Sequence, residues 1–329
     1  MKKFLISAIC MLFIISCSEN KGDTENKDNE YPYPSLCTSI TKCYDNSSEI
    51  NCPSEGEAFY GQDAQYTNLC IPVSYNVSGV EPEKIVTDNN TGLHWQKTAS
   101  DESFKWDNAM SHCKELDYGG YADWRLPSVK ELLSILNHKE SHPAIDINYF
   151  PDTKPESYWT STSYAGNIDK AWNVIFRNNG SSQYLDKTDY SYTKQYARCV
   201  RGEKWNPGNE FTKIDISEKI VLKDLQSGLF WTKEYSNNSM TWEDALAYCE
   251  NLEYADFTDW RLPNINELIT LVDYSSDLPA SSFPGMTNNI FWSSSSSSDR
   301  IQSAKSLNFT HGDKTSPPKT YKAFVICAR

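Results

Sequence analysis

Apolar residues recur in two stretches of the chain with the spacing of one helix face. In each stretch they stand at i, i+3, i+4, i+7 and i+10, along one side of an α-helix. The two sets are Trp106, Ala109, Met110, Cys113 and Leu116, and Trp242, Ala245, Leu246, Cys249 and Leu252. The pattern predicts an amphipathic helix in each half of the chain, with a cysteine on its buried face.

A second helix is predicted after each of these, directly behind the sequence DWRLP. Its start is marked by a capping residue with an acid three positions later, Ser128 with Glu131 and Asn264 with Glu267. In such a pair each side chain satisfies a backbone N–H group at the helix start.

Strands are predicted on both sides of the helices. A strand and a turn come first, at 85–95 and 220–231, where Gly92 and Gly228 each follow a polar pair, as a hairpin-like turn requires.

Strands led by tryptophan follow the second helix, at 158–163 and 291–296. The serine run 293–298 is expected to continue the second of these strands into a flexible loop. A last strand in each half carries Cys199 or Cys327.

These elements form an internal repeat. With an offset of 136, residues 85–137 align with 221–273 without a gap, and 19 of the 53 positions are identical. Because the shared positions include Trp, Gly, Pro and Cys at fixed places, duplication explains them and chance does not. The expected fold class is α+β, in two tandem domains at 84–202 and 219–329, joined by a linker at 203–218.

The cysteines of each copy have a predicted pairing. One lies on the buried face of the first helix and one in the last strand, so Cys113–Cys199 and Cys249–Cys327 would close each domain. Closing loops of this length stabilises a domain by roughly 4–5 kcal/mol in the chain-entropy model.

A further cysteine-rich segment precedes the repeats. Residues 31–83 contain Cys37, Cys43, Cys52 and Cys70 and are expected to form a separate small unit with two disulfides. The sequence leaves all three pairings open.

The first residues predict export and lipid anchoring. Lys2 and Lys3 precede an apolar run that is too short to span a membrane and ends before Cys17. Residues 1–16 resemble a bacterial lipoprotein signal peptide, which implies acylation of Cys17 and insertion of the lipid into a bilayer. By the same resemblance, Ser18 after the acylated cysteine favours location in the outer membrane. Residues 17–30 are expected to be an acidic tether between the membrane and the folded part. The sequence leaves open whether the protein faces the periplasm or the outside of the cell.

Charge narrows the choice of partners. The chain has 31 Lys and Arg against 44 Asp and Glu, which argues against nucleic-acid binding. The stretch 300–329 is locally basic, with one acid. Its candidate contacts for a sulfated or anionic polysaccharide are Arg300, Lys305, Lys314, Lys319 and Lys322. The alternative is a solvated loop face without a ligand.

The order of motifs TGLxW, WxxAxxxC and DWRLPxxxEL, followed by a Trp-led strand and a Cys-containing strand, resembles a known family. It is similar to the C-terminal domain of collagen-like bacterial adhesins, the Lcl C-terminal domain family. The resemblance implies a fold akin to C-type lectin-like domains and a role at the cell surface, since the best-known member binds sulfated glycosaminoglycans. No collagen-like Gly-x-y tract precedes the domains here.

The residues of DWRLP are assigned a structural role. Arg125 is expected to pair with Asp123 or Glu131, because a planar guanidinium suits a carboxylate. The second copy repeats the motif, and the structural residues are Trp124, Arg125, Glu131, Trp260, Arg261 and Glu267.

Other candidate chemistry has a simpler explanation. Asp88, Asn90 and Gly92 carry oxygen ligands of the kind that Ca²⁺ takes, but a plain turn is favoured. His138 and His142 stand four apart and could share a metal, but surface histidines are favoured. No catalytic residue, cofactor or metal is assigned.

The expected function is therefore non-enzymatic binding at the cell envelope, as an adhesin for sulfated or anionic glycans. The alternative is an envelope scaffold or protein-interaction module, whose partners are other envelope proteins and not a glycan.

Overall fold

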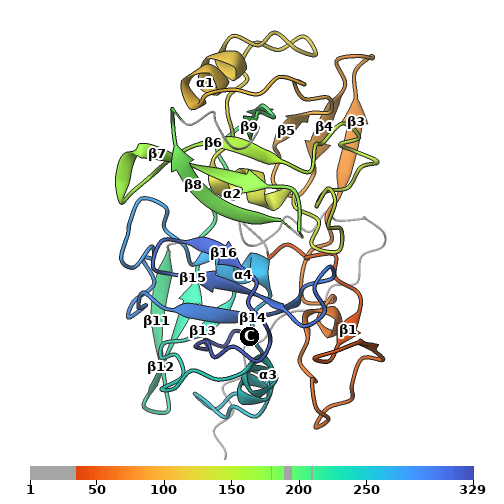
Figure 1. Cartoon of the computed structure of the whole chain (residues 1–329). Helices are drawn as coiled ribbons and strands as arrows, with labels where there is room; N and C mark the ends of the chain where they lie inside the picture. The colour runs from red at the N-terminus through yellow and green to blue at the C-terminus, as the bar shows by residue number, and fades with distance from the viewer. Residues whose placement is uncertain (1–34, 179, 189–194, 209) are drawn as a thin grey trace, which may run out of the picture. The chain divides into compact units, whose positions relative to one another are not determined.

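The computed structural model describes residues 35–178, 180–188, 195–208 and 210–329 (Figure 1). The expected signal peptide at 1–16, the acylated Cys17 and the tether at 17–30 lie outside these ranges. Within them, no helix has the length and apolar content needed to cross a membrane.

The first repeat contains two four-stranded sheets and two helices. One sheet has the order β10-β5-β4-β3 and the other β8-β7-β6-β9. The elements are β3 (Tyr75–Ser78), β4 (Ile85–Asp88), β5 (His94–Gln96), α1 (Trp106–Lys114), α2 (Val129–Ser134), β6 (Ser157–Tyr164), β7 (Asn167–Ile175), β8 (Ser181–Asp186), β9 (Gln195–Tyr196) and β10 (Val200–Arg201).

The second repeat follows the same order with two three-stranded sheets, β11-β12-β13 and β14-β15-β16. Its elements are β11 (Phe211–Ile216), β12 (Lys219–Asp224), β13 (Phe230–Thr232), α3 (Trp242–Glu250), α4 (Ile265–Thr270), β14 (Ile290–Ser296), β15 (Ala304–Asn308) and β16 (Asp313–Thr315). The chain is thus mixed helix and sheet with more strand than helix, and both predicted helices of each repeat are present.

The predicted helix starts are confirmed. Ser128 accepts a hydrogen bond from the backbone N–H of Glu131, whose carboxylate accepts one from the N–H of Ser128. Asn264 and Glu267 form the same reciprocal pair. The helices that follow have six residues each, so most of their backbone N–H groups lie at the helix start, where the capping side chains supply hydrogen-bond acceptors.

Four disulfides join the eight cysteines of the described residues. Cys113–Cys199 and Cys249–Cys327 close the two repeats as expected. The pairing left open by the sequence is Cys37–Cys70 and Cys43–Cys52.

Two segments that were expected to lie outside the repeats pair with strands of the repeats. The predicted linker 203–218 contains β11, which pairs with β12 along its whole length. The turn between them places Ser217 and Glu218 at positive φ (48° and 64°), which matches the twist of a two-residue hairpin. Neither residue is Gly or Asn, so the sequence carries no hairpin signal at this place.

The segment 31–83 is also not a separate unit. Its last part contains β3, which pairs with β4 of the first repeat. Its earlier part contains β1 (Cys43–Tyr44), β2 (Glu49–Ile50) and η1 (Asp63–Gln65), and η1 packs on β14 of the second repeat (Figure 1). Residues 35–72 are called the Cys-rich segment below.

The serine run is interior and not a loop. Ser293 to Ser297 are all buried, and β14 extends to Ser296. Burial is tolerated because the hydroxyls have partners: that of Ser293 donates to the carbonyl of Lys305, and that of Ser295 donates to Asp63.

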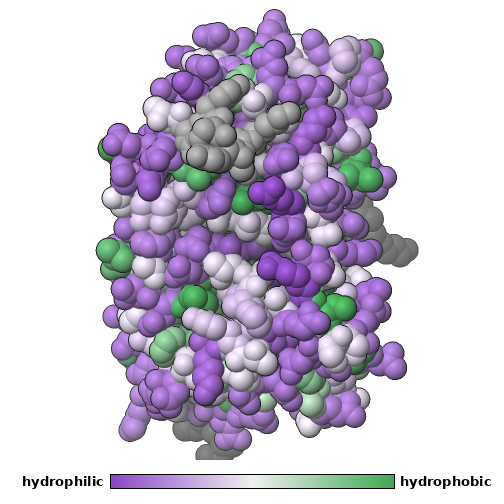
Figure 2. Space-filling model, in the orientation of Figure 1, coloured by the Kyte–Doolittle hydropathy of each residue, from purple (hydrophilic) through white to green (hydrophobic). Residues whose placement is uncertain are grey.

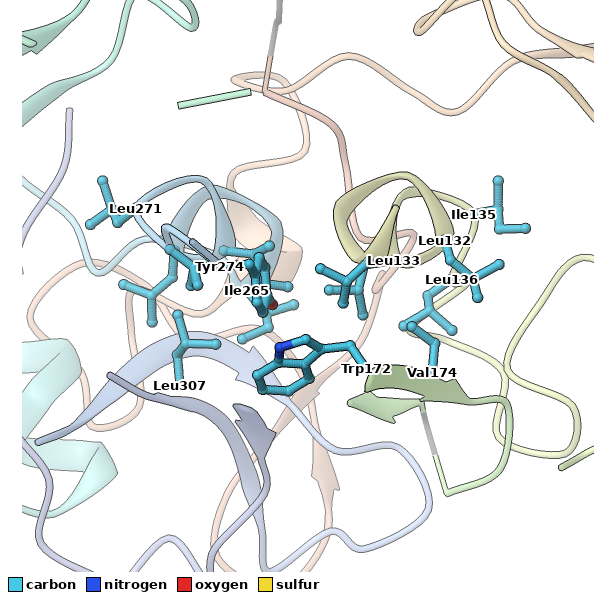
Figure 3. Close-up of a cluster of buried hydrophobic side chains, with 14 of the residues drawn as sticks. Leu132, Leu133, Ile135, Leu136, Trp172, Val174, Ile265, Leu271, Tyr274 and Leu307 are labelled. Carbon is cyan, nitrogen blue, oxygen red and sulfur yellow. The ribbon is translucent and has the colours of Figure 1, made fainter. Parts of the chain in front are cut away.

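A single hydrophobic core crosses from one repeat to the other. It includes Val129, Leu132 and Leu133 from α2 together with Ile265, Leu268 and Ile269 from α4. Trp172 of β7 reaches towards Tyr274, and their ring centroids are 5.0 Å apart (Figure 3). The two repeats therefore bury their facing surfaces against each other.

Candidate functional site

The basic cluster at 300–329 is not a surface patch. Lys305, Lys314 and Lys319 are 0%, 2% and 1% exposed, and only Arg300 and Lys322 of the five candidates are exposed. The predicted polyanion contact is therefore wrong for these three lysines, and it stays a prediction for Arg300 and Lys322. The prediction rested on the excess of basic residues along the sequence, which does not show where their side chains lie. Strand β15 is covered on both faces and β16 packs against β8, so the lysines in these strands point inward.

The buried lysines reach neighbouring parts of the chain. Lys319 Nζ donates to the carbonyl of Asp45, at 2.6 Å, and lies 4.3 Å from the ring centroid of Trp242. Lys314 Nζ lies 3.3 Å from Nδ1 of His138. Lys305 Nζ has no hydrogen-bond partner among the described residues, and burial lowers the pKa of Lys305 to about 7.

His138 is likewise interior and not a surface histidine. Its Nε2 lies 2.9 Å from Oδ1 of Asn266, so it joins the first repeat to the second. Within the described ranges, no group of three or more His, Cys, Asp or Glu side chains is arranged to hold a metal ion.

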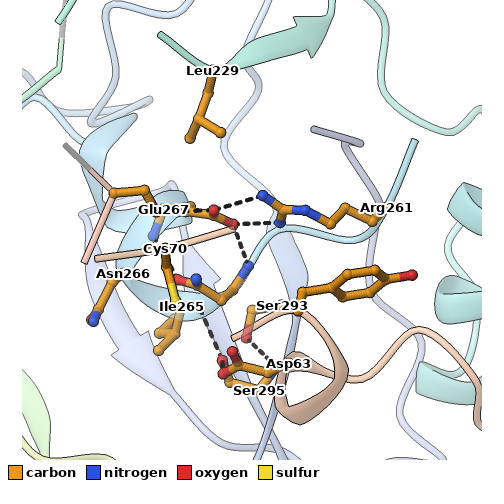
Figure 4. Close-up of polar contacts among 12 residues, drawn as sticks. Asp63, Cys70, Leu229, Arg261, Ile265, Asn266, Glu267, Ser293 and Ser295 are labelled. Carbon is orange, nitrogen blue, oxygen red and sulfur yellow. Dashed lines mark hydrogen bonds and ion pairs between the residues drawn. The ribbon is translucent and has the colours of Figure 1, made fainter. Parts of the chain in front are cut away.

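The arginines of DWRLP have the structural role assigned to them. Both Nη atoms of Arg261 donate to Glu267, at 2.7 Å each (Figure 4). Arg125 binds Glu131 with the same two distances. Glu267 is fully buried, so this two-point contact supplies the charge compensation that it needs. Of the two partners left open for Arg125, the structure selects Glu131.

The aspartate of DWRLP pairs with a different arginine in each repeat. Asp123 binds Arg201 and Asp259 binds Arg329, which ties each motif to the end of its own repeat. The tryptophans beside them, Trp124 and Trp260, are buried.

The turn at Asp88 is a plain turn. Oδ1 of Asp88 accepts a hydrogen bond from the backbone N–H of Asn90, at 2.9 Å, and Gly92 takes a positive φ of 72°. The carboxylate is buried and is used by its own turn.

A pocket of about 570 Å³ lies between the Cys-rich segment and helix α3. Glu55 and Glu57 come from the Cys-rich segment, and Glu243, Asp244 and Glu250 come from α3. Phe59 and Tyr60 add aromatic surface to the same walls. We call this site the acidic pocket; its volume lies in the range that small ligands and side chains of a partner occupy.

The fold brings the two walls of the acidic pocket very close together at one point. Tyr66 Oη donates to Oε1 of Glu250, at 2.6 Å. A Cβ atom at residue 61 would lie 2.7 Å from the same oxygen, so Gly61 permits this approach. Burial raises the pKa of Glu250 above its ordinary value.

No salt bridge joins a carboxylate of the acidic pocket to a basic side chain among the described residues, although the charge of Arg261 acts on Glu250. Asp244 accepts a hydrogen bond from Thr241, and Glu57 accepts one from the N–H of Ser54. Carboxylates gathered around a concave surface create a negative potential that attracts cations and repels polyanions.

The acidic pocket was not foreseen from the sequence. Residues 18–84 contain 12 acids and 4 basic residues, but nothing in the sequence places this excess against α3. In the first repeat the positions equivalent to Asp244 and Glu250 are Asn108 and Lys114. The acidic pocket is therefore a feature of the second repeat alone.

Comparison with known proteins agrees with the repeated motifs. The Lcl C-terminal domain matches residues 84–201 and 220–329, which together make up more than half of the chain. No curated protein matches the chain. The chain belongs to the Lcl C-terminal domain family and carries two copies of its domain in tandem.

Proposed function

We propose that the protein is a non-enzymatic binding protein of the cell envelope, and that its acidic pocket binds a positively charged group of a partner. The observation that carries this proposal is the set of five carboxylates around a concave site of ligand size, none of which forms a salt bridge with a described basic side chain. It favours the protein-interaction alternative over an adhesin for sulfated glycans, because a polyanion would be repelled there.

The walls of the acidic pocket suit a Lys or Arg side chain. The carboxylates attract the charge over a distance, and Phe59 and Tyr60 offer aromatic surface to the methylene stem and the cation. Glu250 is half-buried, so its interaction with a bound cation is less screened than that of an exposed acid.

The described cysteines supply no free thiol, which fits a binding role. The cysteines of the described residues are all paired in disulfides, and the charged motif DWRLP is used within the fold. The face of the molecule in Figure 2 is largely hydrophilic, with apolar residues scattered across it. A surface of this kind fits a partner that is recognised by charge and hydrogen bonds.

The location and the finer fold belong to the same proposal. Each repeat is proposed to be a C-type-lectin-like domain, and the protein is proposed to be anchored in the outer membrane through acylated Cys17. Four disulfides support an oxidising compartment, where such bonds persist.

The test measures binding of a fluorescently labelled octalysine peptide to the purified protein by fluorescence anisotropy. We expect saturable binding that weakens as salt rises. Glu243→Gln should weaken it about fivefold, the effect of ~1 kcal/mol from one charge contact. The matched control is Asp107→Asn, which removes an acid from the equivalent position of α1 and should change nothing. Equal binding by Glu243→Gln and the unchanged protein would contradict the proposal.

A further inference from the structure

The two repeats differ at one equivalent place, which is filled by a side chain in the second repeat and open in the first. In the second repeat the side chain of Asp63, delivered by η1 of the Cys-rich segment, lies on β14 and is 5% exposed (Figure 4). Its Oδ2 accepts hydrogen bonds from Oγ of Ser295 and from Oγ1 of Thr38, the latter at 2.7 Å. An acid from outside the repeat thus fills this place.

The surroundings of Asp63 have close equivalents in the first repeat. Oγ of Ser295 accepts from the N–H of Ile265, at 3.0 Å, and Oγ1 of Thr162 accepts from the N–H of Val129, at 3.1 Å. Ser295 and Thr162 therefore hold the same position in the two repeats.

The neighbouring chain segments correspond as well. Oγ of Ser35 donates to Oε1 of Glu267, and the N–H of Trp205 donates to Oε1 of Glu131, both at 3.0 Å. Residues 205–208 thus cross the first repeat where residues 35–38 cross the second.

In the first repeat this place is an open crevice of about 330 Å³. Its walls include Ser128, Lys130, Thr162, Ser163 and Asn206 of the first repeat and its connection, and Asp273 of the second repeat. Among the described residues, no acid is hydrogen-bonded to Thr162 as Asp63 is to Ser295; Asp273 in the wall is bonded to Ser275 and Ser276 instead.

The charges around the crevice favour an acid. Lys130 lies in its wall, and Lys187 Nζ donates to Oγ of Ser163, at 2.9 Å. Asp273 opposes them, but its oxygens already accept hydrogen bonds from Ser275 and Ser276. Lys130 is buried and its Nζ donates to the carbonyl of Pro207, at 2.5 Å, so it contributes positive charge from behind the wall while Lys187 is the cation that a bound acid can approach.

We propose that this crevice binds an acidic turn of a partner protein, with an Asp or Glu side chain placed on Thr162 as Asp63 is placed on Ser295. The second repeat supplies the template: one hydroxyl from the strand, and an acid carried on a short turn. This site is distinct from the acidic pocket and goes beyond the function proposed above.

The probe is a labelled peptide with the sequence of residues 59–68, which carries Asp63 in its own turn. Its binding to the whole purified protein is measured by fluorescence anisotropy. We expect saturable binding that weakens with salt, and about tenfold weaker binding of the same peptide with Asp63→Asn, as for the loss of a hydrogen bond to a charged group.

Two protein variants locate the site. Lys187→Ala and Thr162→Val should each weaken binding of the peptide several-fold, and thermal unfolding checks that both variants are folded. Thr258→Val, an exposed threonine of the second repeat, is the matched control and should bind normally. Glu243→Gln in the acidic pocket should also bind the peptide normally, which separates this site from the proposed function.

The results that would overturn the inference are specific. Absence of peptide binding, equal binding of the Asp63→Asn peptide, or full binding by both Lys187→Ala and Thr162→Val would each show that the crevice does not select an acidic turn.

Discussion

At the scale of single residues, the buried lysines are the least expected feature of this protein. An ammonium group loses its hydration when it is buried, and a hydrogen-bonded partner is needed to offset that cost. Lys319 has the carbonyl of Asp45, whereas Lys305 Nζ has no hydrogen-bond partner among the described residues. Lys305 should therefore lower the stability of the fold at neutral pH.

Replacement of this lysine tests that expectation. Lys305→Met keeps the length of the side chain and removes the charge, so we expect stability at pH 7 to be unchanged or higher by about 1–2 kcal/mol. The measurement is the free energy of unfolding in guanidinium chloride. A large loss of stability would show that the amine has a favourable partner in the folded protein. Lys322→Met, at an exposed lysine, is the control and should have little effect.

The same lysine predicts a dependence of stability on pH. The folded pKa of Lys305 is lowered to about 7, below the ordinary value of 10.5, so between these values the unfolded chain binds one more proton. Stability should therefore rise with pH from about 7 to 10, by up to ~1.4 kcal/mol per pH unit from this group. The slope should be smaller in Lys305→Met than in Lys322→Met, and equal slopes would contradict the assignment.

At the scale of elements, each repeat is held by a long covalent link between its first helix and the end of the repeat; the closing cysteines Cys199 and Cys327 were expected within a last strand but lie outside the strands of the structure. Cys249 of α3 is joined to Cys327 with a sequence separation of 78, whereas Cys43 and Cys52 are only 9 apart. A longer closed loop removes more conformational freedom from the unfolded chain.

The two links should therefore differ in their effect. Cys249→Ala with Cys327→Ala is expected to lower the free energy of unfolding by about 4–5 kcal/mol, and Cys43→Ala with Cys52→Ala by about 2.5 kcal/mol. Denaturant unfolding of the two double variants measures both values. The reverse order would show that strain or packing, and not loop length, decides their contributions.

At the scale of the whole molecule, the repeats are joined by polar contacts as well as by the shared core. Oη of Tyr164 in the first repeat lies 3.1 Å from Asp277 and 2.9 Å from Nδ1 of His311 in the second. The core residues of α2 and α4 would be exposed to water if the repeats separated.

Cooperative unfolding is the expected consequence. The described residues belong to one compact unit, and calorimetry of the purified protein should show one unfolding transition. Asp277→Ala should lower the temperature of that transition without splitting it. Two resolved transitions in the unchanged protein would mean that each repeat is stable without the other.

Features that depend on near neighbours could be predicted from the sequence. The helix faces, the capping pairs at Ser128 and Asn264 and the closing disulfides of the repeats all follow from spacing along the chain. The duplication made these inferences stronger, because each pattern occurs twice. Strand β11 could not be predicted, because its hairpin uses Ser217 and Glu218 at positive φ.

The sequence by itself determined the family, the repeat, the helices with their capping pairs and the closing disulfides of the repeats. Only the tertiary structure decided which charges meet solvent and which surfaces become sites. Lys305 and Lys314 are basic in the sequence and buried in the fold, while Glu55 and Glu250 meet across 195 residues of chain to line one pocket. The physical reason is that exposure depends on packing between distant segments, which no local pattern of residues encodes.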